Sequence, residues 1–216
     1  MMMGEIPGGS QVKQRHVLRL WLFNPFVKLA GTNALIIGMI FMAGTALFGT
    51  LGSSHFDGVL NVHFGKPAPY WQFVLEILVN WLSLVIPLAI SALILSRSSW
   101  RVIDLLGTQA LALWPYLIVT VIGLFSKPAI QKVIENIDSI MKNSPEALQA
   151  VKTELAIVTI YGIFSILIII WTVMLMYRSY AISCNVKGAR AIISFIVSLI
   201  IAISGSSYVI QKLLLS

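Results

Sequence analysis

The chain has 216 residues, of which 58% are hydrophobic and only 11% are charged. Soluble domains carry about a quarter of their residues as charged side chains, so the composition excludes a soluble globular protein and favours one surrounded by hydrocarbon. The formal net charge of +7 would suit a nucleic-acid partner. The basic residues, however, stand in short connections beside apolar stretches, as membrane-orientation signals do. No nucleic-acid partner is therefore expected.

Five stretches are long and apolar enough to cross a membrane, which takes about 20 residues of helix. They are 29–51, 70–95, 102–125, 155–177 and 191–210. The sequence therefore predicts an all-α fold: a polytopic integral membrane protein whose five-helix membrane domain covers 29–212. A basic cytoplasmic segment, 1–28, precedes it. That segment has no continuous apolar core, so we expect no cleavable signal peptide, and the first span serves as its own insertion signal.

The connection between the third and fourth spans has a helical pattern of its own. Apolar residues of 128–142 fall on one helical face and polar residues on the other. This predicts an amphipathic helix that lies on the membrane surface or against the bundle. Ser144, Pro145 and Glu146 then match an N-cap, a first-turn proline and a first-turn acid, so a further helix should begin there and run into the fourth span.

The connection between the first two spans, 53–69, allows two interpretations. Leu60, Val62 and Phe64 alternate with polar residues, which is typical of a strand. Phe56, Val59, Leu60 and Phe64 would serve equally well as one face of a helix. Periodicity over so short a run does not decide between them, and both remain open at this stage.

The distribution of basic residues predicts an orientation. If the connections alternate between two sides, the side of the N-terminal segment holds nine basic residues, including every arginine, and the other side holds six lysines. Basic residues of short loops stay in the cytoplasm. We therefore expect a bacterial cytoplasmic membrane protein with its N-terminus inside and its C-terminus outside.

The second span carries a polar stripe in steps of three or four residues, which places these side chains on one face: Gln72, Glu76, Asn80, Ser83, Pro87 and Ser91. A carboxylate within a membrane usually faces the protein interior or water, so Glu76 is the first functional candidate. Glu76 lies only about 9 Å below Tyr70, however, and the alternative is that it simply reaches headgroup water. Pro87 removes a helix hydrogen bond and predicts a kink.

The third span adds Asp104 and Gln109 to this candidate intramembrane polar site. Asp104 stands one turn after Arg101, which predicts a local ion pair. Glu76 and Asp104 belong near opposite membrane faces, so they are not expected to form a carboxylate pair. Pro115 predicts a second kink near the middle of the membrane.

Small residues recur every fourth position in the first and fifth spans: Ala30, Ala34 and Gly38, then Ser194, Ser198, Ala202 and Ser206. Lipid supplies little hydrophobic drive between helices, so close approach at small residues holds membrane bundles together. The pattern predicts tight helix packing, within one chain or at the seam of a homo-oligomer.

The remaining candidates are weaker. His55, Asp57 and His63 could supply three metal ligands, but no fourth is evident, and we expect neither a metal nor a cofactor. Basic residues of the N-terminal segment either bind anionic lipid headgroups or only determine topology: Lys13, Arg15, Arg19 and Lys28. The single cysteine, Cys184, cannot form a disulfide within the chain.

Three features resemble the Yip domain family, five-span membrane proteins named for interaction with Ypt/Rab GTPases. They are the Phe-Asn-Pro-Phe start at 23–26, the basic turn leading to Asp104, and the stretch 107–115, which reads GTQALALWP. The resemblance extends over about 25–210 and includes the number and spacing of the spans. Eukaryotic members carry an Asp-Leu-Tyr-Gly-Pro signature before their first span, which this chain lacks. It is more similar to the compact bacterial members, and the family supplies no catalytic residues.

These features together predict a non-enzymatic membrane protein of the Yip type that acts through lipids, other membrane proteins or a homo-oligomer. The alternative is a small transporter or channel with a polar path along Gln72, Glu76 and Asn80. A transporter requires a hydrated path past Glu76. A contact role requires a sealed bundle with grooves that open sideways to lipid.

Overall fold

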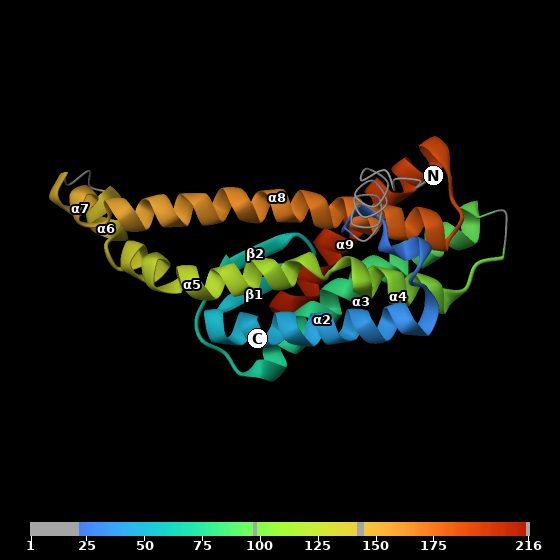
Figure 1. Ribbon diagram of the computed structural model, residues 1–216, viewed down its shortest axis with the longest axis horizontal. Helices are drawn as coiled ribbons and strands as arrows, with labels where there is room; N and C mark the ends of the chain where they lie inside the picture. Colours follow the sequence, from blue (N-terminus) through green and yellow to red (C-terminus); the bar gives the residue numbers. More distant parts are fainter. Residues whose placement is uncertain (1–21, 97–98, 142–144, 215–216) are drawn as a thin grey trace, which may run out of the picture.

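Figure 1 shows the computed structural model, which describes residues 22–96, 99–141 and 145–214. Its elements, in chain order, are η1 (Pro25–Val27), α2 (Gly31–Gly52), β1 (Ser54–Gly58), β2 (Asn61–Phe64), α3 (Tyr70–Leu95), α4 (Val102–Ala112), α5 (Pro115–Glu135), α6 (Ile137–Met141), α7 (Pro145–Ala150), α8 (Lys152–Ser183) and α9 (Gly188–Leu214). We call the end of the bundle where α2, α4 and α9 begin the N-terminal end. The opposite end, where α3 begins, is the hairpin end.

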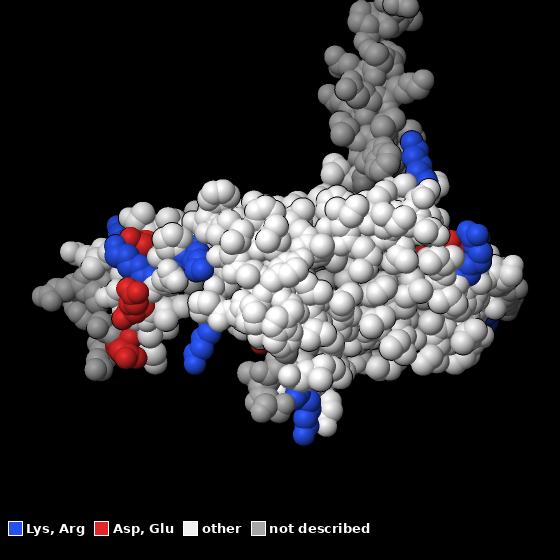
Figure 2. Space-filling view, turned by 90° about the horizontal axis from the view of Figure 1, so that it is seen from below, with Lys and Arg blue, Asp and Glu red and all other residues white. Residues whose placement is uncertain are grey.

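Five helical segments are long and apolar enough to cross a membrane: α2, α3, the α4–α5 pair, α8 and α9. This confirms the expected all-α bundle of five spans. Large apolar side chains cover the outside of these helices, among them Ile40, Leu93 and Phe125, which are 66%, 74% and 79% exposed. Figure 2 shows a broad belt without charged side chains between charged ends on the face drawn. An exposed apolar surface of this extent is typical of a protein that contacts lipid.

Small residues bring α2 and α4 together. Ala34 is fully buried, and a Cβ atom built on Gly38 would lie only 2.6 Å from the backbone of Ala110. Gly107 approaches α2 as closely, because its Cβ position lies 2.4 Å from the carbonyl oxygen of Gly31. Ala30 differs from its expected role: it is exposed at the N-cap position of α2 and lies outside this seam.

The serine and alanine stripe of α9 faces the inside of the bundle, where α9 packs along α3. Ser194, Ser198, Ala202 and Ser206 are all buried. The Ser198 hydroxyl lies 3.0 Å from the hydroxyl of Ser91 on α3. The repeat therefore serves packing within one chain.

The pair α5 and α8 reaches beyond the rest of the bundle (Figure 1). α8 has 32 residues and is about 48 Å long at 1.5 Å per residue, against about 30 Å of hydrocarbon. Lys132 of α5 and Glu154 of α8 form an ion pair across the two helices. The third span divides into α4 and α5 at Pro115, where a kink was predicted, and Pro87 lies inside the continuous helix α3.

The expected amphipathic helix differs in its limits. Its first half is the end of α5, which continues through Pro128 to Glu135 because α8 packs along it, and only Ile137–Met141 forms the separate helix α6. Its apolar face is only partly covered: Ile130 is buried, but Ile134 and Met141 are exposed. Pro145 begins the short helix α7, which ends before α8; Ser144 lies outside the described residues.

The connection between α2 and α3 is a β-hairpin, which resolves the two open interpretations in favour of strands. β1 and β2 pair antiparallel, with Ser54 opposite Phe64 and His55 opposite His63. Ser53 ends α2 in the left-handed conformation, with φ of 55°, and turns the chain into β1. The hairpin contacts α2, α3, α5 and α9, so it closes one end of the bundle.

Candidate functional site

Glu76 lies in the second turn of α3 and points into the bundle, where only 1% of its surface is exposed. Its Oε1 atom lies 2.8 Å from Nδ1 of His55 on β1. Its Oε2 atom accepts the backbone N–H of Phe56 at 2.9 Å, and Gln72 approaches Oε1 at 3.5 Å. The carboxylate thus binds the backbone and the imidazole of the hairpin inside the bundle.

The contact made by the second ring nitrogen of His55, Nε2, shows that this nitrogen carries a hydrogen. Nε2 lies 2.8 Å from the carbonyl oxygen of Lys66, and because a carbonyl only accepts, Nε2 must carry a hydrogen. Glu76 receives its other hydrogen bonds from N–H groups, which favours a carboxylate that also accepts from Nδ1–H. His55 and Glu76 therefore form a buried ion pair when the imidazole is protonated.

The pKa of His55 is higher than usual. Burial alone lowers it, but the hydrogen bonds to Glu76 and to the Lys66 carbonyl, with the negative charges of Glu76 and Asp57, together outweigh that effect and raise it. Retaining the proton strengthens the contact between β1 and α3.

A cavity of about 350 Å³ lies beside this pair at the hairpin end. Asp57, His63 and Gln72 line it together with His55 and Glu76, and Ile210 and Gln211 of α9 close one side. The cavity offers acidic, basic and amide groups to a small polar molecule or to water.

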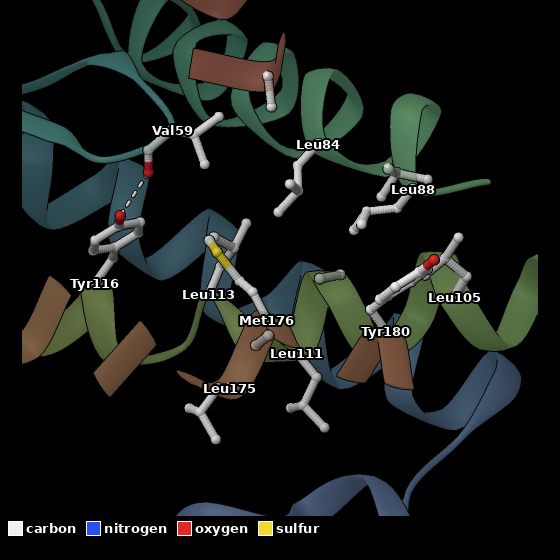
Figure 3. Packing of buried hydrophobic residues seen from close by; sticks show 14 of the residues in the cluster. Val59, Leu84, Leu88, Leu105, Leu111, Leu113, Tyr116, Leu175, Met176 and Tyr180 are labelled. Atoms are coloured by element: carbon white, nitrogen blue, oxygen red, sulfur yellow. Dashed lines mark hydrogen bonds between the residues drawn. The ribbon is translucent and has the colours of Figure 1, made fainter. Parts of the chain in front are cut away.

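Three helices hold the hairpin over the bundle. Asn80 of α3 donates from Nδ2 to the carbonyl of Phe56 at 2.8 Å. Tyr116 of α5 donates its hydroxyl to the carbonyl of Val59 at 2.6 Å (Figure 3), and the backbone N–H of Val59 donates to Ser206 of α9 at 3.3 Å. The polar groups of the stripe thus serve the backbone of the hairpin.

Beyond Asn80, large apolar side chains of α3, α4 and α8 meet inside the bundle. Leu84 and Leu88 of α3 face Met176 and Tyr180 of α8 and Leu105 of α4, all with at most 2% exposed surface (Figure 3). Ser83, the next member of the predicted stripe, is only half-buried. Between Asn80 and Ser91, whose hydroxyl meets that of Ser198, packed leucines fill the bundle-facing side of α3.

The other predicted polar residues lie on α4, with Asp104 at the N-terminal end and Gln109 deeper in the bundle, beside Met176. Arg101 donates two hydrogen bonds to Asp104, at 2.8 and 2.9 Å, which is the expected local pair. Gln109 is buried and donates from Nε2 to the Met176 carbonyl at 2.9 Å. Thr108, another polar residue of the third span, joins the hydroxyls of Ser179 and Ser183 at 2.8 and 2.7 Å. The hydrogen bonds of Gln109 and Thr108 tie α4 to α8.

The three candidate metal ligands lie close together but pair with different partners. The rings of His55 and His63 are 5.7 Å apart, and His63 Nε2 lies 3.3 Å from Asp57 Oδ2, whereas His55 binds Glu76. No three His, Cys, Asp or Glu side chains within the described residues are grouped so that they could hold a metal ion.

The pairing of His55 with Glu76 was missed by sequence reasoning because 21 positions separate them and the hairpin was not assigned. Of the predicted headgroup ligands, Lys13, Arg15 and Arg19 lie outside the described residues. Lys28 is exposed directly after η1, at the N-terminal end of the bundle.

The five spans, the uncharged belt and the buried polar anchors define a multi-pass membrane protein. No protein-family model, curated protein or solved structure matches the chain.

Proposed function

We propose that this protein acts without catalysis, through contacts with lipids or other membrane proteins, in the manner of the Yip family that its sequence resembles. The observation that carries the proposal is the sealed interior between Asn80 and the N-terminal end, where Leu84 and Leu88 are packed with 2% exposure or none. A bundle closed in this way acts through its outer surface.

Charge supports a lipid-contact role. The described part of the N-terminal end holds five basic side chains (Lys28, Arg101, Arg178, Lys187 and Arg190) and one acidic side chain, Asp104. Such clusters bind anionic headgroups of the cytoplasmic leaflet. We propose that this end faces the cytoplasm of a bacterial cell and that the C-terminus lies outside.

Lipid selectivity tests the proposal. The full-length protein is placed in liposomes of phosphatidylglycerol and phosphatidylcholine, and the immobilised fraction of each spin-labelled lipid is measured by electron paramagnetic resonance. We expect an excess of immobilised phosphatidylglycerol that falls when Lys13, Arg15, Arg19 and Lys28 are replaced by Gln. The matched control replaces Lys66 and Lys212, both at the hairpin end, by Gln. This control should retain the excess of immobilised phosphatidylglycerol. Equal immobilisation of both lipids by the wild-type protein would contradict lipid contact.

One observation favours a second candidate, a small transporter: the cavity of about 350 Å³ reaches Glu76. In that case liposomes should show a solute or proton flux that Glu76→Gln abolishes. We expect a pH-sensitive dye inside the liposomes to report the same leak for wild type, Glu76→Gln and empty vesicles.

A further inference from the structure

A second cavity, of about 420 Å³, forms an apolar groove on the side of the bundle near the N-terminal end. Its lining includes Leu22, Leu29, Ile37, Phe41, Leu111 and Trp114. The walls thus come from the segment before α2, from α2 itself and from the end of α4. All lining side chains are apolar, so the groove suits hydrocarbon and not a polar solute.

The groove has the depth of one lipid leaflet. It extends from Leu29, just before α2, to Phe41, which lies ten residues after Gly31. At 1.5 Å per residue these ten residues measure about 15 Å, which is half of the roughly 30 Å hydrocarbon core. One acyl chain of a phospholipid fits this length.

Aromatic rings make one wall of the groove rigid. Trp114 packs against Phe41 at 6.2 Å and meets the ring of Trp171 edge-on at 4.9 Å, and Phe23 lies 6.2 Å from Trp171. The indole N–H of Trp171 also donates to the carbonyl of Leu22 at 3.1 Å. The groove is therefore preformed, which lowers the entropy cost of binding.

Two basic residues lie next to the segment that lines the groove. Lys28 precedes Leu29 in the chain, and Arg178 donates one N–H to the carbonyl of Phe23 at 3.0 Å. A guanidinium has five N–H groups, so others can reach a phosphate. The one described acidic residue at this end, Asp104, binds Arg101 through both carboxylate oxygens. A second copy of the chain docked here by two-fold symmetry would bring like charges together.

We propose that this groove binds one acyl chain of an anionic phospholipid, with Lys28 and Arg178 holding the phosphate. The proposal rests on the lipid-contact function given above and names its ligand and site. It also explains why a cavity lined by apolar side chains persists beside a basic surface.

Native mass spectrometry of the delipidated full-length protein, titrated with phosphatidylglycerol or phosphatidylcholine, tests the site. Ile37→Trp should fill the groove and abolish the preference for phosphatidylglycerol. The matched control is Ile36→Trp, because Ile36 neighbours Ile37 but is 54% exposed outside the groove. Arg178→Gln should weaken phosphatidylglycerol binding about fivefold, which corresponds to about 1 kcal/mol per basic residue. Lys66→Gln, at the hairpin end and away from the basic cluster, should leave it unchanged. Leu29→Trp is the second groove-filling variant in case Ile37→Trp unfolds.

The outcomes distinguish a failure of the groove proposal from a failure of the lipid-contact function. If wild type prefers phosphatidylglycerol and both groove-filling variants retain that preference, the groove proposal is wrong and lipid contact stands. If wild type shows no preference, the lipid-contact function fails with it. A lipid-free dimer that the groove-filling variants break would show that a second copy occupies the groove, and would overturn the proposal.

Discussion

Nδ1 of His55 lies 2.8 Å from Oε1 of Glu76, and this buried pair joins the β-hairpin to the second turn of α3. The contact determines how the hairpin end of the bundle is closed. It also explains how a carboxylate with 1% exposed surface remains within an apolar protein.

Replacing Glu76 should loosen the hairpin. Glu76→Ala leaves the His55 ring and the Phe56 N–H without their partner, and removing one member of a buried pair costs about 3–5 kcal/mol. Glu76→Gln should cost less, because its amide oxygen can still accept the Phe56 N–H. The measurement is the thermal unfolding midpoint in detergent together with protease cleavage of 53–69. Equal midpoints for wild type and Glu76→Ala would contradict the anchoring role.

The same pair predicts a pH dependence of stability. The pKa of His55 is raised in the folded protein. The stability that the protonated imidazole contributes is therefore fully present below the ordinary histidine pKa of about 6.5. It is lost as the pH rises through the raised pKa of the folded state. Glu76, Gln72, Asp57, His63 and Lys66 surround the imidazole at this end.

The thermal unfolding midpoint should therefore fall as the pH rises from the ordinary histidine pKa through the raised pKa of His55. His55→Gln should remove this dependence of the midpoint on pH. His63→Gln is the control, since the His63 side chain is 41% exposed. A slope that survives in His55→Gln would assign the titration to another group.

Much of the architecture could be predicted from the sequence, because span length and hydropathy depend on local composition. The predicted second span, 70–95, coincides with α3, and the kink predicted at Pro115 falls where α4 gives way to α5. The polar pairs were not predictable in the same way. His55 meets Glu76 only because the left-handed turn at Ser53 and the antiparallel register return the chain over α3. Neither the turn nor the register can be predicted from the pattern of apolar residues in so short a loop.

The contact between α2 and α4 depends on the absence of a side chain at Gly38. A methyl group there would lie 2.6 Å from the backbone of Ala110, and overpacking of this kind costs about 1–3 kcal/mol. Gly38→Ala should lower the unfolding midpoint. Gly162→Ala is the matched control, because no atom lies within 4 Å of its Cβ position, and it should be neutral or slightly stabilising. A Gly38→Ala midpoint as high as that of Gly162→Ala would show that the helices do not approach so closely.

Cys184 should be unreactive in the folded protein. Its thiol is buried between α8 and α9, and burial raises its pKa to about 12, so little thiolate forms at neutral pH. Maleimide should label Cys184 only after denaturation, as read by mass spectrometry. An engineered cysteine at the exposed Gln211, in contrast, should react in the folded state. Rapid labelling of native Cys184 would mean that the α8–α9 turn opens.

Water access along α3 tests the sealed bundle most directly. Single cysteines at Gln72, Ser83 and Ser91, introduced with Cys184 replaced by serine, are exposed in liposomes to a charged, membrane-impermeant thiol reagent. We expect Gln72→Cys to react through the cavity at the hairpin end, and Ser83→Cys and Ser91→Cys to remain unmodified behind Leu84 and Leu88. Reaction at all three positions would reveal a continuous aqueous path, and a transporter would replace the contact function proposed here.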